Sequence, residues 1–219
     1  MTEVLSRTKI LIVDDHSLVR EGLILRLSAF PELEICGEAT SEDEAMGLVK
    51  TTNPGLVIVD ISLKSGHGIE LIKRIRDFSP TIKILVSSGF QESLYAERAL
   101  RAGALGYLNK QDAGENVIEA VRTVLRGERY VSPEITQKLV SQALGNRIES
   151  TNPLDQLSDR ELEIFRMIGS GRASGAIAEE LLLSPHTIDT HRENIKRKLG
   201  LKNAAELSRS AVQFLLERS

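Results

Sequence analysis

The sequence predicts two domains of different fold class: a doubly wound α/β domain with a five-stranded parallel sheet, followed by an all-α domain of four helices. In residues 8–130, short apolar runs alternate five times with longer amphipathic runs, as in strands that are each followed by a helix. After about residue 150 only helical patterns remain, and the polar residues 145–155 before them are typical of a linker. We therefore expect a first domain at 8–130, a helix and linker at 131–156, and a second domain at 157–219.

The five predicted strands are short and aliphatic, and they do not alternate strictly between apolar and polar residues. Continuous apolar runs of this kind are typical of strands buried on both faces of a parallel sheet. In chain order the strands are expected at residues 10–13, weakly around residue 35, and at 56–59, 82–86 and 106–108.

The predicted helices of the first domain repeat apolar residues with the helical period. Ser41 and Glu44 have the spacing of a capping box, which would open the second helix. Pro133 suits the first turn of a further helix, expected over 134–144. The helices between the strands are expected at residues 18–27, 42–50, 69–76, 94–102 and 117–125.

Start and stop signals also divide the second domain into helices. Ser158 and Glu161 form a capping box for a helix at 160–168, and a short helix is expected at 174–182. Ser184 and Pro185 open the third helix, which runs to residue 198 and stops at Gly200.

The fourth helix begins where Asn203 and Glu206 can cap it, and it carries one apolar stripe. The stripe has two interpretations, a surface for a second copy of the chain or packing against the rest of the domain. Its residues are Leu207, Ala211, Phe214 and Leu215.

The composition is that of a globular protein, because 41% of the 219 residues are hydrophobic and 27% are charged. No apolar run approaches the ~20 residues that cross a bilayer, and the N-terminal run at 10–13 is too short for a signal peptide. The single cysteine, Cys36, is expected to be a small core residue. A reduced, cytoplasmic location without membrane contact is therefore expected.

The charge is unevenly distributed. Residues 1–130 carry 16 basic and 19 acidic side chains, whereas residues 157–219 carry 10 basic and 9 acidic ones. Within 187–202 the basic residues outnumber Asp189 and Glu193, so an anionic partner would meet a local positive field, although a solvated helix face also produces this pattern. The basic residues there are Arg192, Lys196, Arg197, Lys198 and Lys202.

Polar side chains follow four of the predicted strands. Asp14 and Asp15 follow the first strand, Asp60 the third, Ser88 the fourth and Lys110 the fifth. The carboxyl ends of neighbouring parallel strands converge on one crevice, so these side chains should lie together. Three carboxylates that close repel one another unless a cation joins them, and oxygen ligands at an open site suit Mg²⁺.

This set of groups fits phosphoryl transfer to a carboxylate. Asp60 would attack phosphorus, the metal would neutralise charge on the oxygens, and Lys110 and Ser88 would hold the remaining phosphoryl oxygens. Each residue alone has a local explanation as a cap, a turn residue or a surface charge. The position of all five at strand ends favours a shared site.

Four stretches resemble the receiver domain of two-component response regulators, which has a flavodoxin-like fold, and the resemblance covers about residues 8–130. It implies that Asp60 takes a phosphoryl group from the phosphohistidine of a sensor histidine kinase. It also implies that Asp15, Asp60 and the backbone carbonyl of Ser62 bind Mg²⁺, with Asp14 acting largely through water. The stretches are ILIVDDH at 10–16, LVIVDISLKSGHG at 56–68, ILVSSG at 84–89 and AGALGYLNK at 102–110.

The same resemblance implies that Ser88 and Tyr107 are a switch hydroxyl and a switch aromatic, although Tyr107 alone would be a partly buried packing residue. It implies no enzyme activity beyond self-dephosphorylation. This chain departs from the family at Lys64, which replaces a usual proline, at Gly89, which replaces a usual alanine, and at Phe90, where a polar residue is common. These departures bear on dephosphorylation rate and partner choice.

In the second domain, a short helix, a turn at 183–185 and a helix with basic residues have the plan of a helix-turn-helix. Residues 157–164 (LSDRELEI), 171–182 and 183–201 (LSPHTIDTHRENIKRKLGL) resemble the LuxR-type output domain, and with the receiver they resemble the NarL/FixJ family. The resemblance implies a transcription regulator that binds double-stranded DNA through a recognition helix of about 185–198. Candidate base or phosphate contacts are Thr187, Asp189, Thr190, His191, Arg192 and Glu193, with Lys196, Arg197, Lys198 and Lys202 nearer the DNA backbone.

The second domain also departs from its family. Residues 173–176 (ASGA) replace a Ser-Asn-Lys-Glu type of sequence, and glycine within a helix costs ~1 kcal/mol. Asp189 stands where some members carry lysine; it could accept from a cytosine amino group but would repel phosphate. Ala204 replaces a frequent arginine. With so little net positive charge, DNA binding is expected to depend on a homodimer formed on phosphorylation.

Two other functions remain open at this point. A phosphohydrolase with an aspartyl nucleophile would need a second acid two residues after Asp60, where this chain has Ser62. Alternatively, the receiver could control a helical domain that binds protein or RNA.

Overall fold

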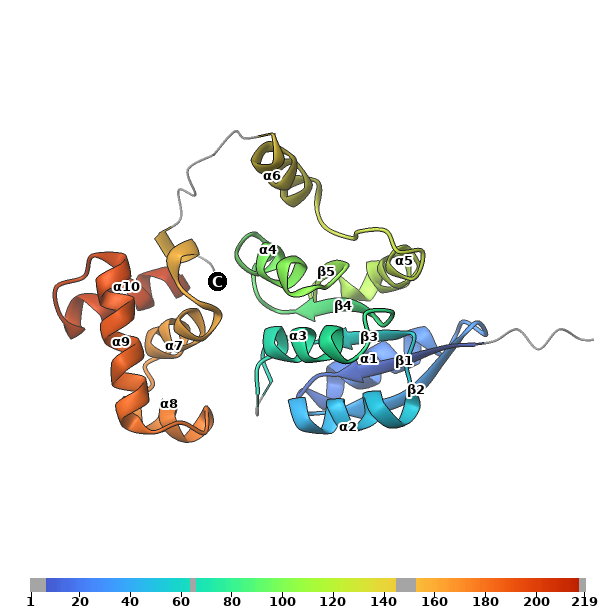
Figure 1. Ribbon diagram of the computed structural model, residues 1–219, viewed down its shortest axis with the longest axis horizontal. Coiled ribbons are helices and arrows are strands. Elements are labelled where there is room, and N and C mark those ends of the chain that lie inside the picture. The colour runs from blue at the N-terminus through green and yellow to red at the C-terminus, as the bar shows by residue number, and fades with distance from the viewer. Residues whose placement is uncertain (1–6, 64–65, 145–152, 217–219) are drawn as a thin grey trace, which may run out of the picture. The chain divides into compact units, whose positions relative to one another are not determined.

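In a computed structural model, residues 7–63, 66–144 and 153–216 are described, and the chain divides into two compact units, one up to Val140 and one from Ser141 onward (Figure 1). We describe each unit by itself. No helix in the described ranges is both long enough and apolar enough to cross a membrane.

The first unit contains the predicted five-stranded sheet, with all strands parallel and in the order β2-β1-β3-β4-β5. The strand order reverses between β1 and β3, which places a crevice at the carboxyl ends of these two central strands. The strands are β1 (Thr8–Val13), β2 (Leu33–Ala39), β3 (Leu56–Val59), β4 (Lys83–Ser88) and β5 (Gly106–Asn109).

The second strand gives the weakest sequence signal and is the longest strand of the sheet. As an edge strand β2 is only partly covered, and its residues 35–38 are half-buried or exposed. Its pairing with β1 also shifts register between Ile10 and Leu11. Incomplete burial removes the continuous apolar run that marks the other strands.

Helices cover the sheet, and all the helices expected in the first unit are present. Helices α1 and α5 pack on one face, where their apolar residues join Ile10, Ile12 and Ile58 in one core. Helix α2 packs beside α3 and α3 beside α4. The bounds are α1 (Ser17–Leu27), α2 (Glu42–Thr52), α3 (Gly68–Phe78), α4 (Glu92–Ala102), α5 (Ala113–Leu125) and α6 (Pro133–Ala143).

The start of α3 lies directly against the end of β3. A Cβ atom on Gly68 would lie 2.2 Å from the backbone oxygen of Asp60, so only glycine fits there. The preceding residue, His67, caps the helix, because its Nδ1 accepts a hydrogen bond from the Ile69 N–H at 3.1 Å. Close packing at this point fixes the backbone that presents Asp60.

The capping box expected at the start of α2 is only half correct. Ser41 accepts a hydrogen bond from the Glu44 N–H, as expected. The Glu44 carboxylate, however, accepts from the N–H and hydroxyl of Thr40 rather than from the N–H of Ser41. Glu44 therefore secures the residue before the cap.

The second unit has the four expected helices and one feature that the linker prediction missed. Ser158 and Glu161 form the complete capping box of α7. Residues 153–156, expected as linker, form a 3₁₀ helix whose Leu154 is buried, and residues 145–152 lie outside the described ranges. The helices are α7 (Asp159–Gly169), α8 (Ser174–Glu180), α9 (Pro185–Leu199) and α10 (Ala204–Leu216).

The apolar stripe of α10 belongs to the core, so its interpretation as a dimer surface is wrong. Leu207 and Ala211 are completely buried, and the ring of Phe214 lies 5.8 Å from that of Phe165 on α7. A Cβ atom on Gly169 would lie 2.5 Å from the Ala211 backbone oxygen, which shows how closely α7 and α10 approach. Any partner of α10 must therefore bind its other side.

Candidate functional site

The acidic side chains at the ends of β1 and β3 converge as the sequence predicts. Asp14, Asp15 and Asp60, together with His16, offer ligand atoms that all lie within 4.8 Å of one another. Such a group can hold a metal ion. We refer to these four residues as the acidic pocket.

His16 is the member of the acidic pocket that the sequence analysis missed. Its Nδ1 lies 2.7 Å from Asp15 Oδ1 and 3.4 Å from Asp14 Oδ1, while its side chain remains 63% exposed. Its position directly after the aspartate pair was the available signal. His16 is also the N-cap residue of α1, although its side chain makes no capping hydrogen bond.

Lys110 joins the acidic pocket from the end of β5, as predicted. Its Nζ lies 2.7 Å from Asp14 Oδ2 and 2.7 Å from Asp60 Oδ2. Burial alone would lower the pKa of Lys110, but the charges of Asp60 and Asp14 raise it overall. The ammonium group therefore stays charged and offsets part of the repulsion between the two carboxylates.

Asp60 is almost completely buried, and this burial raises its pKa to about 6. The charge and hydrogen bond of Lys110 and the N–H of Ser62 oppose the rise, whereas the charge of Asp14 adds to it. Asp60 Oδ1 is buried and has no hydrogen-bond partner within residues 7–63, 66–144 and 153–216. An oxygen that lacks a donor in a carboxylate-lined pocket fits a ligand for a hard cation.

Ser88 and Tyr107 both form hydrogen bonds with the backbone of Phe90. The Ser88 hydroxyl accepts a hydrogen bond from the Phe90 N–H at 3.2 Å, and the Tyr107 hydroxyl donates to the Phe90 backbone oxygen at 2.8 Å. Both side chains are buried, so the expectation of a partly buried Tyr107 was wrong, and burial raises the pKa of its hydroxyl. Ser62 is exposed, and Lys64 lies outside the described ranges.

In the second unit, two buried residues orient α9. Ile188 and Ile195 are completely buried, while Leu199, which was also expected to face inward, is only half-buried. This orientation leaves Asp189, Thr190 and Glu193 exposed on the other side of the helix. The exposed side has the position that a recognition helix offers to DNA.

Several of the predicted DNA-contact side chains already bind neighbours within the unit. Lys196 pairs with Glu193 at 2.8 Å, and Arg192 donates to the Ser174 hydroxyl at the start of α8. Other interactions hold Thr187 to Ser184, Thr190 to His186 and Arg197 to Asn194. His191 Nδ1 is buried with no hydrogen-bond partner in the described part of the chain, and Lys202 is exposed.

Lys198 has a structural role that the sequence analysis did not foresee. Its Nζ lies 2.6 Å from Glu161 Oε2, and Glu161 is the buried carboxylate of the α7 capping box. Burial alone would raise the pKa of Glu161, but the hydrogen bonds from Lys198 and Ser158 lower it overall. The pair links α9 to the start of α7, and Glu161 neutralises the charge of Lys198 within the domain.

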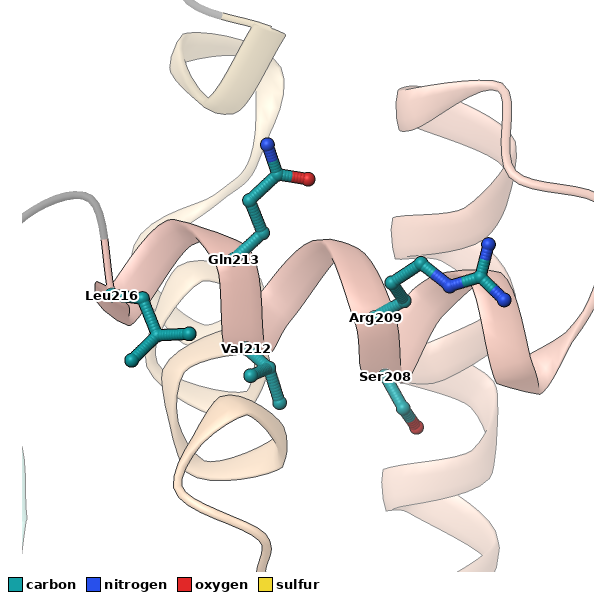
Figure 2. Close-up of a pocket in the computed structure, with 5 residues that line it drawn as sticks. All are labelled: Ser208, Arg209, Val212, Gln213 and Leu216. Atoms are coloured by element: carbon teal, nitrogen blue, oxygen red, sulfur yellow. The ribbon is translucent and has the colours of Figure 1, made fainter.

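The outer side of α10 carries a shallow apolar groove. Figure 2 shows Val212 and Leu216 on the same side of the helix, and they are 41% and 74% exposed. This side lies opposite the buried Leu207 and Ala211. The groove is lined by Ser208, Arg209, Val212, Gln213 and Leu216.

Two family models match the chain. Residues 10–122 match the response regulator receiver domain, and residues 155–211 match the luxR family of bacterial regulatory proteins. The first match contains the acidic pocket, Ser88, Tyr107 and Lys110, and the second contains all of α7, α8 and α9.

Similar curated proteins match over almost the whole length. The response regulator GacA of Pseudomonas aeruginosa is 33% identical over 205 residues, which cover 94% of this chain and 95% of the relative. The oxygen regulatory protein NreC of Staphylococcus aureus is 36% identical over 210 residues, which cover 94% of this chain and 97% of the relative.

Solved structures extend the likeness to the fold. A two-component response regulator of the LuxR family from Aurantimonas has 33% identity and a TM-score of 0.58 over 64% of this chain and 99% of its own. Salmonella enterica RcsB, bound to a promoter in the presence of the phosphomimetic BeF₃⁻, has a TM-score of 0.68. It covers 94% of this chain and 98% of its own, and at 24% identity this likeness concerns the fold alone.

Proposed function

Since this chain belongs to the response regulators that join a receiver domain to a DNA-binding domain of the luxR family, we propose that phosphorylation of Asp60 by a sensor histidine kinase controls how the second domain binds DNA. The buried Asp60, with one oxygen on Lys110 and the other without a donor in the described ranges, is the observation that carries the proposal. The domain boundaries proposed are 8–130 for the receiver, 131–156 for the helix and linker, and 157–219 for the DNA-binding domain.

The reaction at Asp60 is a substitution at phosphorus. A carboxylate oxygen of Asp60 forms a P–O bond while the P–N bond of the kinase's phosphohistidine breaks, and the histidine nitrogen leaves with the bonding electron pair. Lys110, already 2.7 Å from Asp60, would hold a phosphoryl oxygen by its charge, and the Ser88 hydroxyl would hold another.

Magnesium is the metal proposed for the acidic pocket, held by Asp15, Asp60 and the Ser62 backbone carbonyl, with Asp14 acting through water. When bound, Mg²⁺ would neutralise the charge that develops on the phosphoryl oxygens. The carboxylate-rich donor set and the unpartnered Asp60 Oδ1 support this assignment. The protein's own activity would be limited to self-dephosphorylation.

The phosphoryl group adds about −1.5 to −2 charges beside Ser88. Both switch side chains bind the backbone of Phe90: the Ser88 hydroxyl accepts from its N–H, and the Tyr107 hydroxyl donates to its carbonyl oxygen. Movement of either switch side chain toward Asp60 therefore displaces the segment between β4 and α4. That displacement is the proposed signal.

DNA binding is proposed for α9 and for Lys202 just after it, through the residues named above. Because two of their cations, Lys196 and Lys198, are paired with Glu193 and Glu161, one domain alone would bind weakly. A homodimer would bind two half-sites about one helical turn apart. We assign the contact between copies to the groove of Val212 and Leu216, the apolar side of α10 that the domain itself leaves open.

Treatment with acetyl phosphate and a divalent cation tests the site. Intact-mass measurement should show one added phosphoryl group on the wild-type chain and none on Asp60→Asn. Asp77→Asn, which removes an exposed carboxylate on α3, should be labelled like the wild type. Equal labelling of Asp60→Asn and wild type would show that the site is assigned wrongly.

The assembly needs a separate measurement. Sedimentation of the phosphorylated chain should show a dimer, and Val212→Glu should leave it a monomer, since a charge in the groove opposes association. A monomeric phosphorylated wild type, or an unaffected Val212→Glu dimer, would contradict the assignment to α10.

A further inference from the structure

The segment after α5 is attached to the strand that carries the switch tyrosine. The Tyr130 N–H donates to the Leu105 oxygen at 3.1 Å, and the Tyr107 N–H donates to the Tyr130 oxygen at 2.8 Å. Tyr130 thereby forms a parallel bridge with Gly106 at the edge of the sheet. A Cβ atom on Gly106 would come within 3.0 Å of Tyr130, so the attachment is close. The segment that leads from α5 to α6 is thus hydrogen-bonded to β5 at Tyr130.

A second attachment joins the start of α6 to α4. Glu92 Oε1 accepts a hydrogen bond from the Ser132 N–H at 2.7 Å. Ser132 in turn begins α6, because its hydroxyl accepts from the Ile135 N–H and its oxygen from the Thr136 N–H. A hydrogen bond to an ionised carboxylate is about twice as strong as one between neutral groups. The bond from the Ser132 N–H to Glu92 should therefore be the strongest of the hydrogen bonds that Ser132 makes.

The contact continues along the first turns of α6. Lys138 Nζ lies 3.3 Å from Glu97 Oε2, five residues beyond Glu92 on α4. Ile135 of α6 is almost completely buried. Helix α6 therefore contacts the receiver in its first two turns, through Ile135 and Lys138.

Glu92 also lies next to the segment that the two switch residues hold. The Phe90 N–H donates to the Ser88 hydroxyl and the Phe90 oxygen accepts from the Tyr107 hydroxyl. Glu92 follows Phe90 by two residues, in the first turn of α4. A displacement of Phe90 must therefore move the carboxylate of Glu92 relative to Ser132. The covalent path from Phe90 to Glu92 is short, and hydrogen bonds between buried or half-buried groups fix both of its ends.

We propose that Glu92 is the positioning residue that couples the receiver to α6: it holds the Ser132 N–H before phosphorylation, and displacement of the Phe90 segment on phosphorylation releases the first turn of α6. The inference rests on the proposed function, because it takes Asp60 as the phosphorylated residue. It adds the element that carries the signal out of the receiver, namely α6, which leads into the linker.

Hydrogen exchange of the full chain, followed by mass spectrometry, tests this coupling in peptides covering residues 131–138. In the wild type, acetyl phosphate with Mg²⁺ should make this segment exchange about tenfold faster, the effect of losing one charge-assisted hydrogen bond. In Glu92→Ala the exchange should already be fast without phosphodonor and should not rise further. Glu92→Gln, whose amide oxygen can still accept from Ser132, should restore an intermediate protection.

Glu115→Ala is the matched control. Glu115 is an exposed acid in the first turn of α5, so its removal costs a similar interaction with a helix N-terminus without touching α6. In Glu115→Ala, the hydrogen exchange of residues 131–138 should increase on addition of phosphodonor as it does in the wild type. Glu92→Ala should also accept the phosphoryl group to the wild-type extent, since Glu92 lies outside the acidic pocket.

The outcomes separate this inference from the proposed function. If Asp60 is phosphorylated but residues 131–138 of the wild type keep their protection, the coupling is refuted and the function stands. The same holds if Glu92→Ala exchanges no faster than wild type, or if it loses phosphorylation. If the wild-type chain takes no phosphoryl group, the proposed function fails and the coupling fails with it.

Discussion

At the scale of single residues, the phosphoacceptor is a charged group that the fold would be more stable without. Burial raises the pKa of Asp60 from 3.8 to about 6, although Lys110 lies 2.7 Å away. An acid whose pKa is raised in the folded state destabilises the fold when it ionises. The destabilisation is absent below about pH 3.8 and complete above about pH 6.

Asp60→Asn should therefore stabilise the protein at pH 7 in the absence of divalent cations, by on the order of 2 kcal/mol. The advantage should shrink as the pH falls from 6 to 4, which urea unfolding at a series of pH values can measure. Asp77→Asn, at an exposed position, should stay within about 0.5 kcal/mol of wild type. An Asp60→Asn protein that is less stable than wild type at pH 7 would contradict this account.

A second residue is strained by its backbone. Leu182, in the turn between α8 and α9, has φ of +53°, and its side chain is 79% exposed. Leucine rarely adopts this left-handed conformation, which asparagine tolerates better. No packing is lost when so exposed a side chain is replaced.

Leu182→Asn should raise the stability of the second unit by about 0.5 kcal/mol, whereas Leu182→Val should lower it, because a β-branched residue suits this conformation least. Calorimetry of the full chain measures both values. Equal stabilities of the two variants would mean that the backbone strain is relieved in another way.

At the scale of elements, one ion pair between the buried Glu161 and the half-buried Lys198 links α7 to α9. Glu161 caps α7 and binds Lys198 of α9 at 2.6 Å. The pKa of Glu161 is lowered overall, so this pair stabilises the fold above the ordinary glutamate pKa of about 4.5 and ceases to do so as the pH falls below it.

Glu161→Gln should lower the stability of the second unit at pH 7 by about 1–3 kcal/mol, because Lys198 loses its charged partner and the cap loses its carboxylate. The difference from wild type should narrow below about pH 4.5, as a pH series of calorimetric scans can show. Glu179→Gln, on the exposed side of α8, should change little. If the loss of stability in Glu161→Gln did not depend on pH, its cause would be altered packing and not the loss of the ion pair.

At the scale of the whole molecule, the proposed function predicts how DNA binding depends on salt. Each phosphate contact steepens the fall of affinity with salt, with a slope of about −0.9 per contact on logarithmic axes. If phosphorylation pairs two DNA-binding domains, the slope of the phosphorylated chain should be about twice that of the Asp60→Asn chain. Fluorescence anisotropy with a labelled duplex over a range of KCl concentrations measures both slopes.

Lys202→Gln provides the internal check on that measurement. Lys202 is exposed, and its loss should make the slope of the dimer shallower by about 2, one contact from each copy. Identical slopes with and without phosphorylation would argue that a single domain binds in both states.

The sequence by itself determined the fold class, the order of elements and most of the acidic pocket. Periodicity identified the helices and four of the five strands of the receiver, because buried parallel strands need continuous apolar runs and amphipathic helices need the 3.6-residue period. The partly covered edge strand β2 gave only a weak signal. Asp14, Asp15, Asp60 and Lys110 could be placed together because the ends of adjacent parallel strands must meet at one edge.

Only the tertiary structure decided which side of an element faces the core and which charges pair. The stripe of Leu207 and Ala211 has the pattern of a dimer surface, but contact with α7 buries it. Lys198 resembles a free basic residue until Glu161, 37 positions earlier, is brought beside it. The bond between Glu92 and Ser132 spans 40 positions and leaves no local pattern. Local patterns report what a segment can form, whereas pairing over such separations depends on how the chain closes in space.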